Sequence, residues 1–153
     1  MPFMNEMDAI SGKHAKAFIT INGQVEELFY ARSLEATIEK NKTDVPVVGK
    51  TNVGQKAVGW TGTGTLNIYY VTSLFRRLVR DYIKTGRDFY FDLTVSNEDP
   101  TSAAGRQTVV LKNCNLDSVI AAQFDATSDD PLNEDISFTF DDYDMLEQFA
   151  PLN

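Results

Sequence analysis

The sequence predicts a mainly β protein, an antiparallel β-sandwich or barrel-like fold with one flanking α-helix and a long β-hairpin loop. Three observations lead to this prediction. Apolar and polar residues alternate with a period of two in about seven segments, which is the pattern of half-buried strands. Only one segment has apolar residues at helical spacing, and no apolar run approaches the ~18 residues that a membrane-spanning helix needs. Many strands with one helix favour an antiparallel sheet packed around a single core.

The central hairpin is predicted from residues 33–39 and 58–70, where the alternation is clearest. One face of both arms is polar, and its residues are Glu35, Thr37, Glu39, Thr61, Thr63 and Thr65. Gly62 and Gly64 fall on the apolar face of the second arm. Glycine inside a strand usually marks a bulge, a bend or a close backbone approach, so we expect one of these at the two glycines.

A long inter-strand loop, residues 41–55, is predicted to join the two arms of this hairpin. It is longer than a hairpin connection needs, and it carries Val45, Val47, Val48 and Val53 among lysines, glycines and one proline. A solvated loop rarely holds four valines, whereas a buried loop would leave backbone polar groups without partners. The segment therefore either orders on binding another molecule or folds onto its own domain.

The helix is predicted over residues 73–85, with Thr72 or Ser73 capping its first turn and Gly86 closing its last. Its apolar stripe is expected to lie in the core, and its members are Leu74, Phe75, Leu78, Val79, Tyr82 and Ile83. The arginines between them are expected to face outward: Arg76, Arg77 and Arg80.

The 153 residues are expected to form a single domain, residues 1–153. The N-terminal arm, residues 1–14, is rich in methionine and is either a disordered terminus or an arm that orders against a partner. An Asn-Gly turn at residues 22–23 indicates a first hairpin. Further strands are predicted at residues 89–95, 106–113, 115–124 and 136–140, followed by an acidic C-terminal segment, residues 141–153.

Charge is unevenly distributed along the chain, whose net charge is −8. Every lysine and arginine lies at or before Lys112, while ten of the carboxylates follow it. The acidic part is either a solvated face or a surface that meets a basic part of a neighbouring copy. Tight binding of nucleic acid is not expected in either case, because it requires clustered cations.

Catalytic, cofactor-binding and metal-binding residues are not predicted. The chain has one histidine, His14, in the N-terminal arm, and one cysteine, Cys114, which is expected to be inert and partly buried. A Cys–His pair or a His/Cys metal cluster is therefore not expected. The lone cysteine and the lack of a signal-peptide pattern lead us to expect a protein made and folded in a cytoplasm.

Two stretches resemble a known family: EATIEKNKTDVPVVGKTNVGQKAVGWTGTGTLNIYY and SLFRRLVRDYIKTG. Together with the Phe- and Tyr-rich strand that follows and the closing acidic strand, they resemble bacteriophage tail tube proteins. The resemblance is to the core tail proteins of PBSX-like contractile-tailed prophages in particular, and it covers the whole chain.

The resemblance implies a structural, non-enzymatic subunit whose hexameric rings stack into a hollow tube of the virion tail, assembled in the host bacterial cytoplasm. Implied partners are further copies of the chain and the tail sheath, baseplate and tape-measure proteins. DNA would be only passing cargo, no cofactor is implied, and there is no membrane anchoring. On this interpretation the polar hairpin face lines the lumen. Contact between rings is assigned to Val45, Val47, Val48, Lys50 and Val53.

Two other classes remain open at this point. One is a calcium-dependent carbohydrate-binding β-sandwich module, which would use the acidic cluster of residues 129–135 as hard oxygen ligands. The other is a different tail component on the same fold, such as a baseplate protein or a tail terminator.

Overall fold

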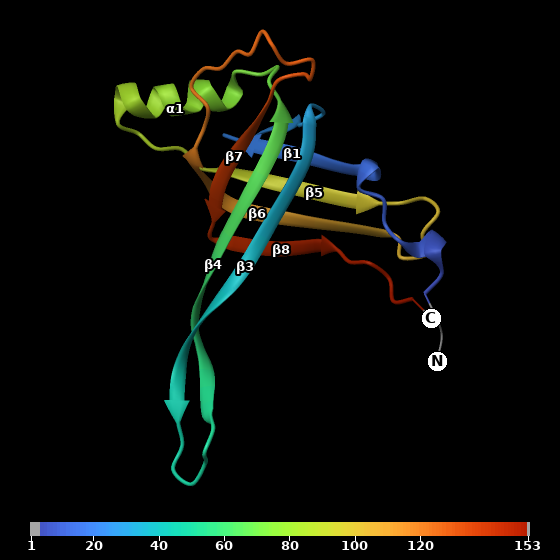
Figure 1. Ribbon diagram of the computed structural model, residues 1–153, viewed down its shortest axis with the longest axis vertical. Coiled ribbons are helices and arrows are strands. Elements are labelled where there is room, and N and C mark those ends of the chain that lie inside the picture. The colour runs from blue at the N-terminus through green and yellow to red at the C-terminus, as the bar shows by residue number, and fades with distance from the viewer. Residues whose placement is uncertain (1–3, 153) are drawn as a thin grey trace.

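A computed structural model describes residues 4–152 as eight antiparallel strands and one α-helix (Figure 1). Two short 3₁₀ turns, Glu6–Asp8 and Gly12–His14, precede the first strand. The strands are β1 (Ala15–Ile21), β2 (Gln24–Glu27), β3 (Ala31–Pro46), β4 (Val53–Tyr69), β5 (Phe91–Glu98), β6 (Arg106–Ser118), β7 (Asn133–Phe140) and β8 (Asp142–Glu147). The helix α1 is Leu74–Thr85. The predicted fold class is confirmed.

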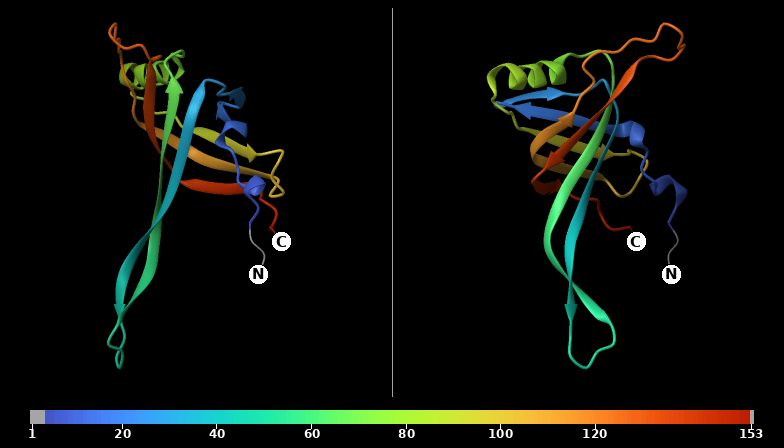
Figure 2. Two further views of the ribbon diagram at one scale, coloured as in Figure 1. Left: turned by 45° about the vertical axis from the view of Figure 1, so that its right-hand side comes forward. Right: turned by 60° about the vertical axis from the view of Figure 1, so that its left-hand side comes forward.

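One strand, β6, belongs to both layers of the fold. Its first part pairs with β5 and β8, and residues from Asn115 onward pair with β7. The change falls at a register irregularity that contains Asn113, which has a φ of 54°. The layers are therefore β2-β1-β5-β6-β8 and β6-β7-β4-β3, and their strands cross steeply in Figures 1 and 2. A strand that switches sheets at a bend is typical of crossed sheet packing.

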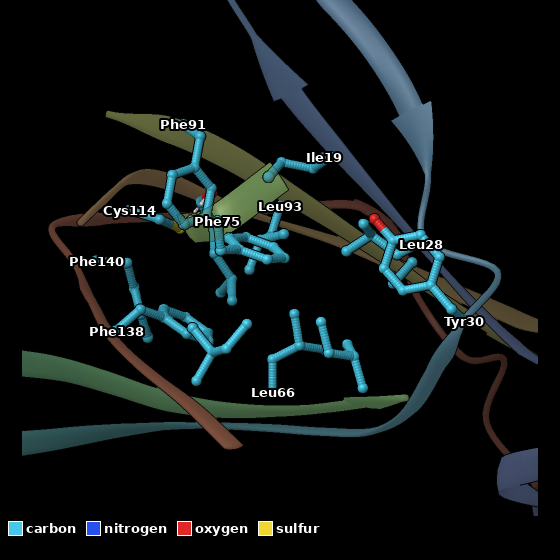
Figure 3. Close-up of a cluster of buried hydrophobic side chains, with 14 residues drawn as sticks. Ile19, Leu28, Tyr30, Leu66, Phe75, Phe91, Leu93, Cys114, Phe138 and Phe140 are labelled. Carbon is cyan, nitrogen blue, oxygen red and sulfur yellow. Dashed lines mark hydrogen bonds between the residues drawn. The ribbon is translucent and has the colours of Figure 1, made fainter. Parts of the chain in front are cut away.

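The hydrophobic core lies between these two layers (Figure 3). Ile19 and Leu93 enter it from β1 and β5, and Leu66 and Phe138 enter it from β4 and β7. Phe75 adds the first turn of α1 and is 1% exposed. The alternation of buried and exposed residues along β5 and β7 is the pattern from which these strands were predicted.

Cys114 is fully buried in this core, where burial raises the pKa of its thiol to about 12. The thiol is therefore neutral near pH 7, and only the thiolate is a nucleophile or metal ligand. The expectation of partial burial was wrong in degree, because the bend in β6 turns Cys114 inward.

The N-terminal segment is held against the loop between β5 and β6. Asp99 accepts hydrogen bonds from the Thr101 side chain at 2.8 Å and from the Ser11 backbone N–H at 3.0 Å, and these bonds lower its pKa. The Ser102 hydroxyl donates to the Asp8 carbonyl at 2.8 Å. Residues 8–14 thus contact their own domain, while residues 1–3 of the predicted N-terminal arm, residues 1–14, lie outside the described residues.

Several predicted boundaries are corrected. The strand expected to reach residue 124 ends at Ser118, and Phe124 is 90% exposed. The acidic C-terminal segment contains a further strand, β8, which pairs with β6. The predicted cap is found at Gly86, which has a φ of 76° and donates its N–H to the Tyr82 carbonyl. In residues 4–152 no helix is both long enough and apolar enough to span a bilayer.

Candidate assembly surfaces

A polar surface forms on β3 and β4 as the alternation predicts. The strands pair Glu35 with Thr65, Thr37 with Thr63, and Glu39 with Thr61. Residues directly opposite each other in an antiparallel pair project from the same face. All six side chains are exposed, so they form one continuous surface, which we call the polar face.

The polar face continues onto β7 and the end of β6. Thr63 pairs with Thr139, which in turn pairs with Asn115, and Thr65 pairs with Ser137. A shallow depression in this surface is lined by Glu35, Thr37, Thr63, Thr65, Asp117 and Ser137, together with Gly64 and Phe138. The charged groups among these residues are carboxylates, so the surface is acidic and rich in hydroxyls.

The opposite face of β4 is shaped by its two glycines. Gly62 pairs with Phe140 and Gly64 pairs with Phe138, and each ring covers the glycine beside it. A Cβ atom at position 64 would lie 2.4 Å from Phe138 Cζ, and one at position 62 would lie 2.5 Å from Phe140 Cε2. The sequence allowed a bulge, a bend or a close backbone approach, whereas the structure shows the close approach of an aromatic side chain.

The segment predicted as a loop, residues 41–55, is mostly strand. β3 continues to Pro46 and β4 begins at Val53, so the connection is only residues 47–52. It contains a turn in which the Lys50 N–H donates to the Val47 carbonyl and Gly49 has a φ of 89°. These strand ends were not predicted because the alternation breaks at a bulge. Asn41 pairs with Gly59 and Lys42 pairs with Ala57, which leaves Val58 unpaired.

Residues 40–58 form a two-stranded ribbon, which we call the arm, that projects from the body along the longest axis of the molecule (Figures 1 and 2). β7 pairs with β4 only from Gly62 onward, so the arm has no third strand. Its exposed apolar residues are Val45, Val47, Val48, Val53 and Val58. It also carries four lysines and one carboxylate: Lys40, Lys42, Lys50, Lys56 and Asp44. An isolated ribbon is marginally stable in water, so a partner would stabilise it.

An apolar groove at the base of the arm was not predicted. It is lined by Ile38, Lys40, Ala57, Gly59, Trp60, Asp142 and Tyr143. Trp60 lies 6.0 Å from Phe140 between ring centroids but is 41% exposed, because β7 ends at Phe140 and the core ends with it. The alternation of residues 58–70 puts Trp60 on the apolar face. It does not show that the Trp60 ring is partly exposed to solvent, because that depends on where β7 ends.

The prediction that the helix stripe lies in the core is right for Phe75 and wrong for its C-terminal end. Leu74, Leu78 and Val79 are half-buried, whereas Tyr82 and Ile83 are 47% and 69% exposed. The start of α1 lies nearest the sheets and its C-terminal end extends away from the body (Figure 1), while Leu74 and Leu78 line a groove together with Ile19 of β1. The stripe therefore reflects an amphipathic helix that is only partly covered in the single chain.

Arg76 was predicted to face outward, and it faces inward. Its guanidinium contacts both carboxylate oxygens of Glu134 at 2.9 and 3.0 Å, and Glu134 is 1% exposed. It also donates to the Thr72 carbonyl and lies 4.3 Å from the centre of the Tyr70 ring. This buried ion pair fastens the start of α1 to β7. Arg77 and Arg80 are exposed as predicted.

The acidic cluster at residues 129–135 is divided by the fold. Glu134 points into the body toward Arg76, and Asp135 on the opposite face of β7 accepts a hydrogen bond from Asn67 at 2.7 Å. Within residues 4–152, no group of three or more His, Cys, Asp or Glu side chains is arranged to hold a metal ion. The calcium-dependent module consequently loses the site that it required.

The protein belongs to the phage tail tube protein family, whose sequence model matches residues 2–147. The resemblance noted in the sequence is confirmed. A relative from Bacillus subtilis strain 168, the phage-like element PBSX protein XkdM, is 37% identical over 96% of this chain and 97% of its own. A second protein of that strain, YqbM, is 38% identical over 95% of each chain and is uncharacterized.

Solved structures with the same fold include chains of the anti-feeding prophage and of an extracellular contractile injection system. The tube-terminating cap of the anti-feeding prophage has a TM-score of 0.70 at 15% identity, over 98% of this chain and 95% of the other. A chain of the extended sheath–tube complex of an extracellular contractile injection system has a TM-score of 0.61 at 20% identity, covering 88% and 89%. A chain of the anti-feeding prophage baseplate reaches 0.67 at 13% identity, covering 90% and 95%. At these identities the likeness concerns the fold.

Proposed function

We propose that this protein is the subunit of a phage or prophage tail tube, in which hexameric rings stack into a hollow conduit for DNA passage or cell-envelope penetration. Family membership and the shared fold support a tail component. The single observation that carries the tube in particular is the polar face, which unites six exposed Thr and Glu side chains on one side of the sheet.

The lumen is assigned to this polar face. A conduit for a polyanion must not hold the phosphates, and binding of phosphate depends on cations that displace its counterions. Glu35, Glu39 and Asp117 on this face are carboxylates and supply none. The cation Arg32 lies at the end of the face, where it donates to Asn67 and lies over the Tyr69 ring. Joining of β3, whose outer edge is unpaired, to a neighbouring copy would also remove an exposed sheet edge.

Contact between rings is assigned to the tip of the arm, through Val45, Val47, Val48, Lys50 and Val53. These residues lie at the far end of the molecule from the body, and Val48 is fully exposed. Further partners proposed for the assembled tail are the sheath, the baseplate and the tape-measure protein. The site of action is the virion tail, after assembly in the host bacterial cytoplasm.

The experiment is negative-stain imaging of concentrated protein beside a variant with a shortened arm. Replacing residues 44–55 by Asn-Gly keeps the Thr43–Lys56 pair and closes it with a two-residue turn suited to a hairpin. We expect tubes of variable length from the native chain and folded monomers or single rings from the variant. Tubes from the shortened chain would remove the arm from the contact between rings. Single rings from the native chain would instead indicate a tail terminator, because a tube-terminating cap has the same fold.

A further inference from the structure

The loop between β6 and β7, residues 119–132, lies at the opposite end of the molecule from the tip of the arm. Figure 1 places the longest axis vertically, with this orange loop at the top and the arm at the bottom, and both views of Figure 2 agree. We call residues 119–132 the distal loop. Copies stacked along this axis in one orientation would bring the arm of one against the distal loop of the next.

The two ends carry opposite charge. The arm has four lysines and one carboxylate, Asp44. The distal loop has three carboxylates and no lysine or arginine: Asp125, Asp129 and Asp130. In the described part of the chain none of these three forms an ion pair. Each end also exposes apolar surface, with the valines on the arm and Phe124 on the loop.

The distal loop is fastened to the body on both sides. Arg76 Nη1 lies 3.5 Å from the Ile120 carbonyl, and the Gln123 side-chain amide donates to the Asn133 carbonyl at 2.9 Å. The Tyr70 N–H donates to the Leu132 carbonyl at 3.0 Å. These contacts fix the two ends of the distal loop, and its three carboxylates lie between the fixed ends.

We propose that the arm of one copy docks on the distal loop of a second copy, and that their opposite charges fix the head-to-tail polarity of the stack. This inference rests on the proposed tube function and identifies the surface that receives the arm. Two arms, or two distal loops, would place like charges against each other, which disfavours the inverted contact. A head-to-tail contact repeated along one axis does not close into a ring, so it continues into a filament.

The carboxylates of β8 are the competing receptor, and their surroundings argue against them. Asp144 lies 4.0 Å from Lys112, Glu147 lies 3.2 Å from Arg106, and Asp142 lines the same groove as Lys40 of its own chain. In Figure 1 the strand lies on the side of the body from which the arm leaves, away from the distal loop. Two of its three carboxylates are thus paired within the chain, and the strand lies at the wrong end of the molecule.

A charge exchange tests the proposal. The arm variant is Lys50→Glu/Lys56→Glu and the loop variant is Asp129→Lys/Asp130→Lys, all four at exposed positions. Each variant alone should raise the protein concentration needed for polymerisation by at least about tenfold, because like charges then face each other at the contact. Both changes in one chain should restore polymerisation, and that chain should not copolymerise with the native protein. A 1:1 mixture of the two single variants should form alternating polymers.

The matched control is Asp142→Lys/Asp144→Lys combined with the arm variant, which should not restore polymerisation. Circular dichroism and thermal melting of every variant establish that the monomers are folded. Suppose that the native protein forms tubes, that shortening the arm abolishes them, and that the loop exchange does not restore them. The distal loop would then be overturned as the receptor, while the tube function would stand. Restoration by the β8 exchange would transfer the receptor to that strand. If the native protein forms no tubes, the proposed tube function itself fails.

Discussion

At the scale of single residues, the two glycines of β4 determine how closely β7 can approach. A strand that presents Gly62 and Gly64 inward offers no side chain of its own, and Phe138 and Phe140 fill the space. Phe138 is 1% exposed, so its ring is enclosed by other parts of the chain. The cost of glycine in a strand is offset by aromatic packing across the ladder.

Gly64→Ala is therefore expected to destabilise the fold by about 1–3 kcal/mol, as overpacking of a tight core does. The matched control is Gly59→Ala on the same strand, where the nearest atom to a new Cβ, Asn41 Nδ2, is 4.0 Å away. Alanine there should change stability by less than about 0.5 kcal/mol. Guanidinium denaturation measures both variants. Equal midpoints for the two would show that the Phe138 ring yields at no cost.

At the scale of elements, the helix shows where a sequence pattern stops being informative. Its spacing predicted the helix and its cap at Gly86, and both are present. The same spacing implied that the whole stripe is buried, but the pattern records only that one face is apolar. How much of that face is covered depends on where the neighbouring strands end, and only Phe75 is fully buried.

The buried partner of Arg76, Glu134, could also not be predicted from the sequence. Glu134 follows Arg76 by 58 residues, and it stood in an acidic part of the chain that was expected to be either a solvated face or a surface meeting a neighbouring copy. Burial of a carboxylate needs a partner with excellent geometry, and Arg76 supplies it from the first turn of the helix. The alternation along β7 alone places Glu134 on the inward side, which is the one signal that could have indicated burial.

Arg76→Ala should consequently cost about 3–5 kcal/mol, because it leaves the Glu134 carboxylate buried without its cation. Arg80→Ala removes an arginine from the exposed side of the same helix and should change stability by less than about 0.5 kcal/mol. Replacing both members of the pair, Arg76→Met/Glu134→Leu, should recover most of the loss, since apolar pairs often substitute for buried ion pairs. Urea titration followed by circular dichroism measures all three. A loss no larger for Arg76→Ala than for Arg80→Ala would contradict the anchoring role.

At the scale of the whole molecule, the sequence was sufficient for the fold class and for the shared face of the six Thr and Glu residues, because both follow from a period of two. It was not sufficient for the arm, since the bulge at Val58 breaks that period where the ribbon leaves the body. The charge asymmetry was visible in the sequence. That the basic arm and the acidic distal loop lie at opposite ends follows from the sheet order, which no local pattern encodes.

The polar face supports a last prediction, on how a tube would treat DNA. Glu35 and Glu39 lie on one strand face, opposite Thr65 and Thr61. In a closed ring their carboxylates would repeat around the channel, and phosphates passing there would lose no counterions and gain no contact. Glu35→Lys/Glu39→Lys reverses this. The monomer should keep its stability within about 0.5 kcal/mol because both positions are exposed.

Tubes of this variant should retain DNA fragments at low salt and release them as salt rises, because each lysine–phosphate contact displaces a counterion that added salt restores. The measurement is the absorbance at 260 nm of tubes pelleted after incubation with DNA, across a salt series. Glu26→Lys/Glu27→Lys makes the same charge change on β2, which lies at the other end of the sheet order, and should retain DNA only at the level of the native tube. Equal retention by both variants would mean that DNA responds to net charge rather than to the channel wall. Retention by neither would place Glu35 and Glu39 away from the lumen.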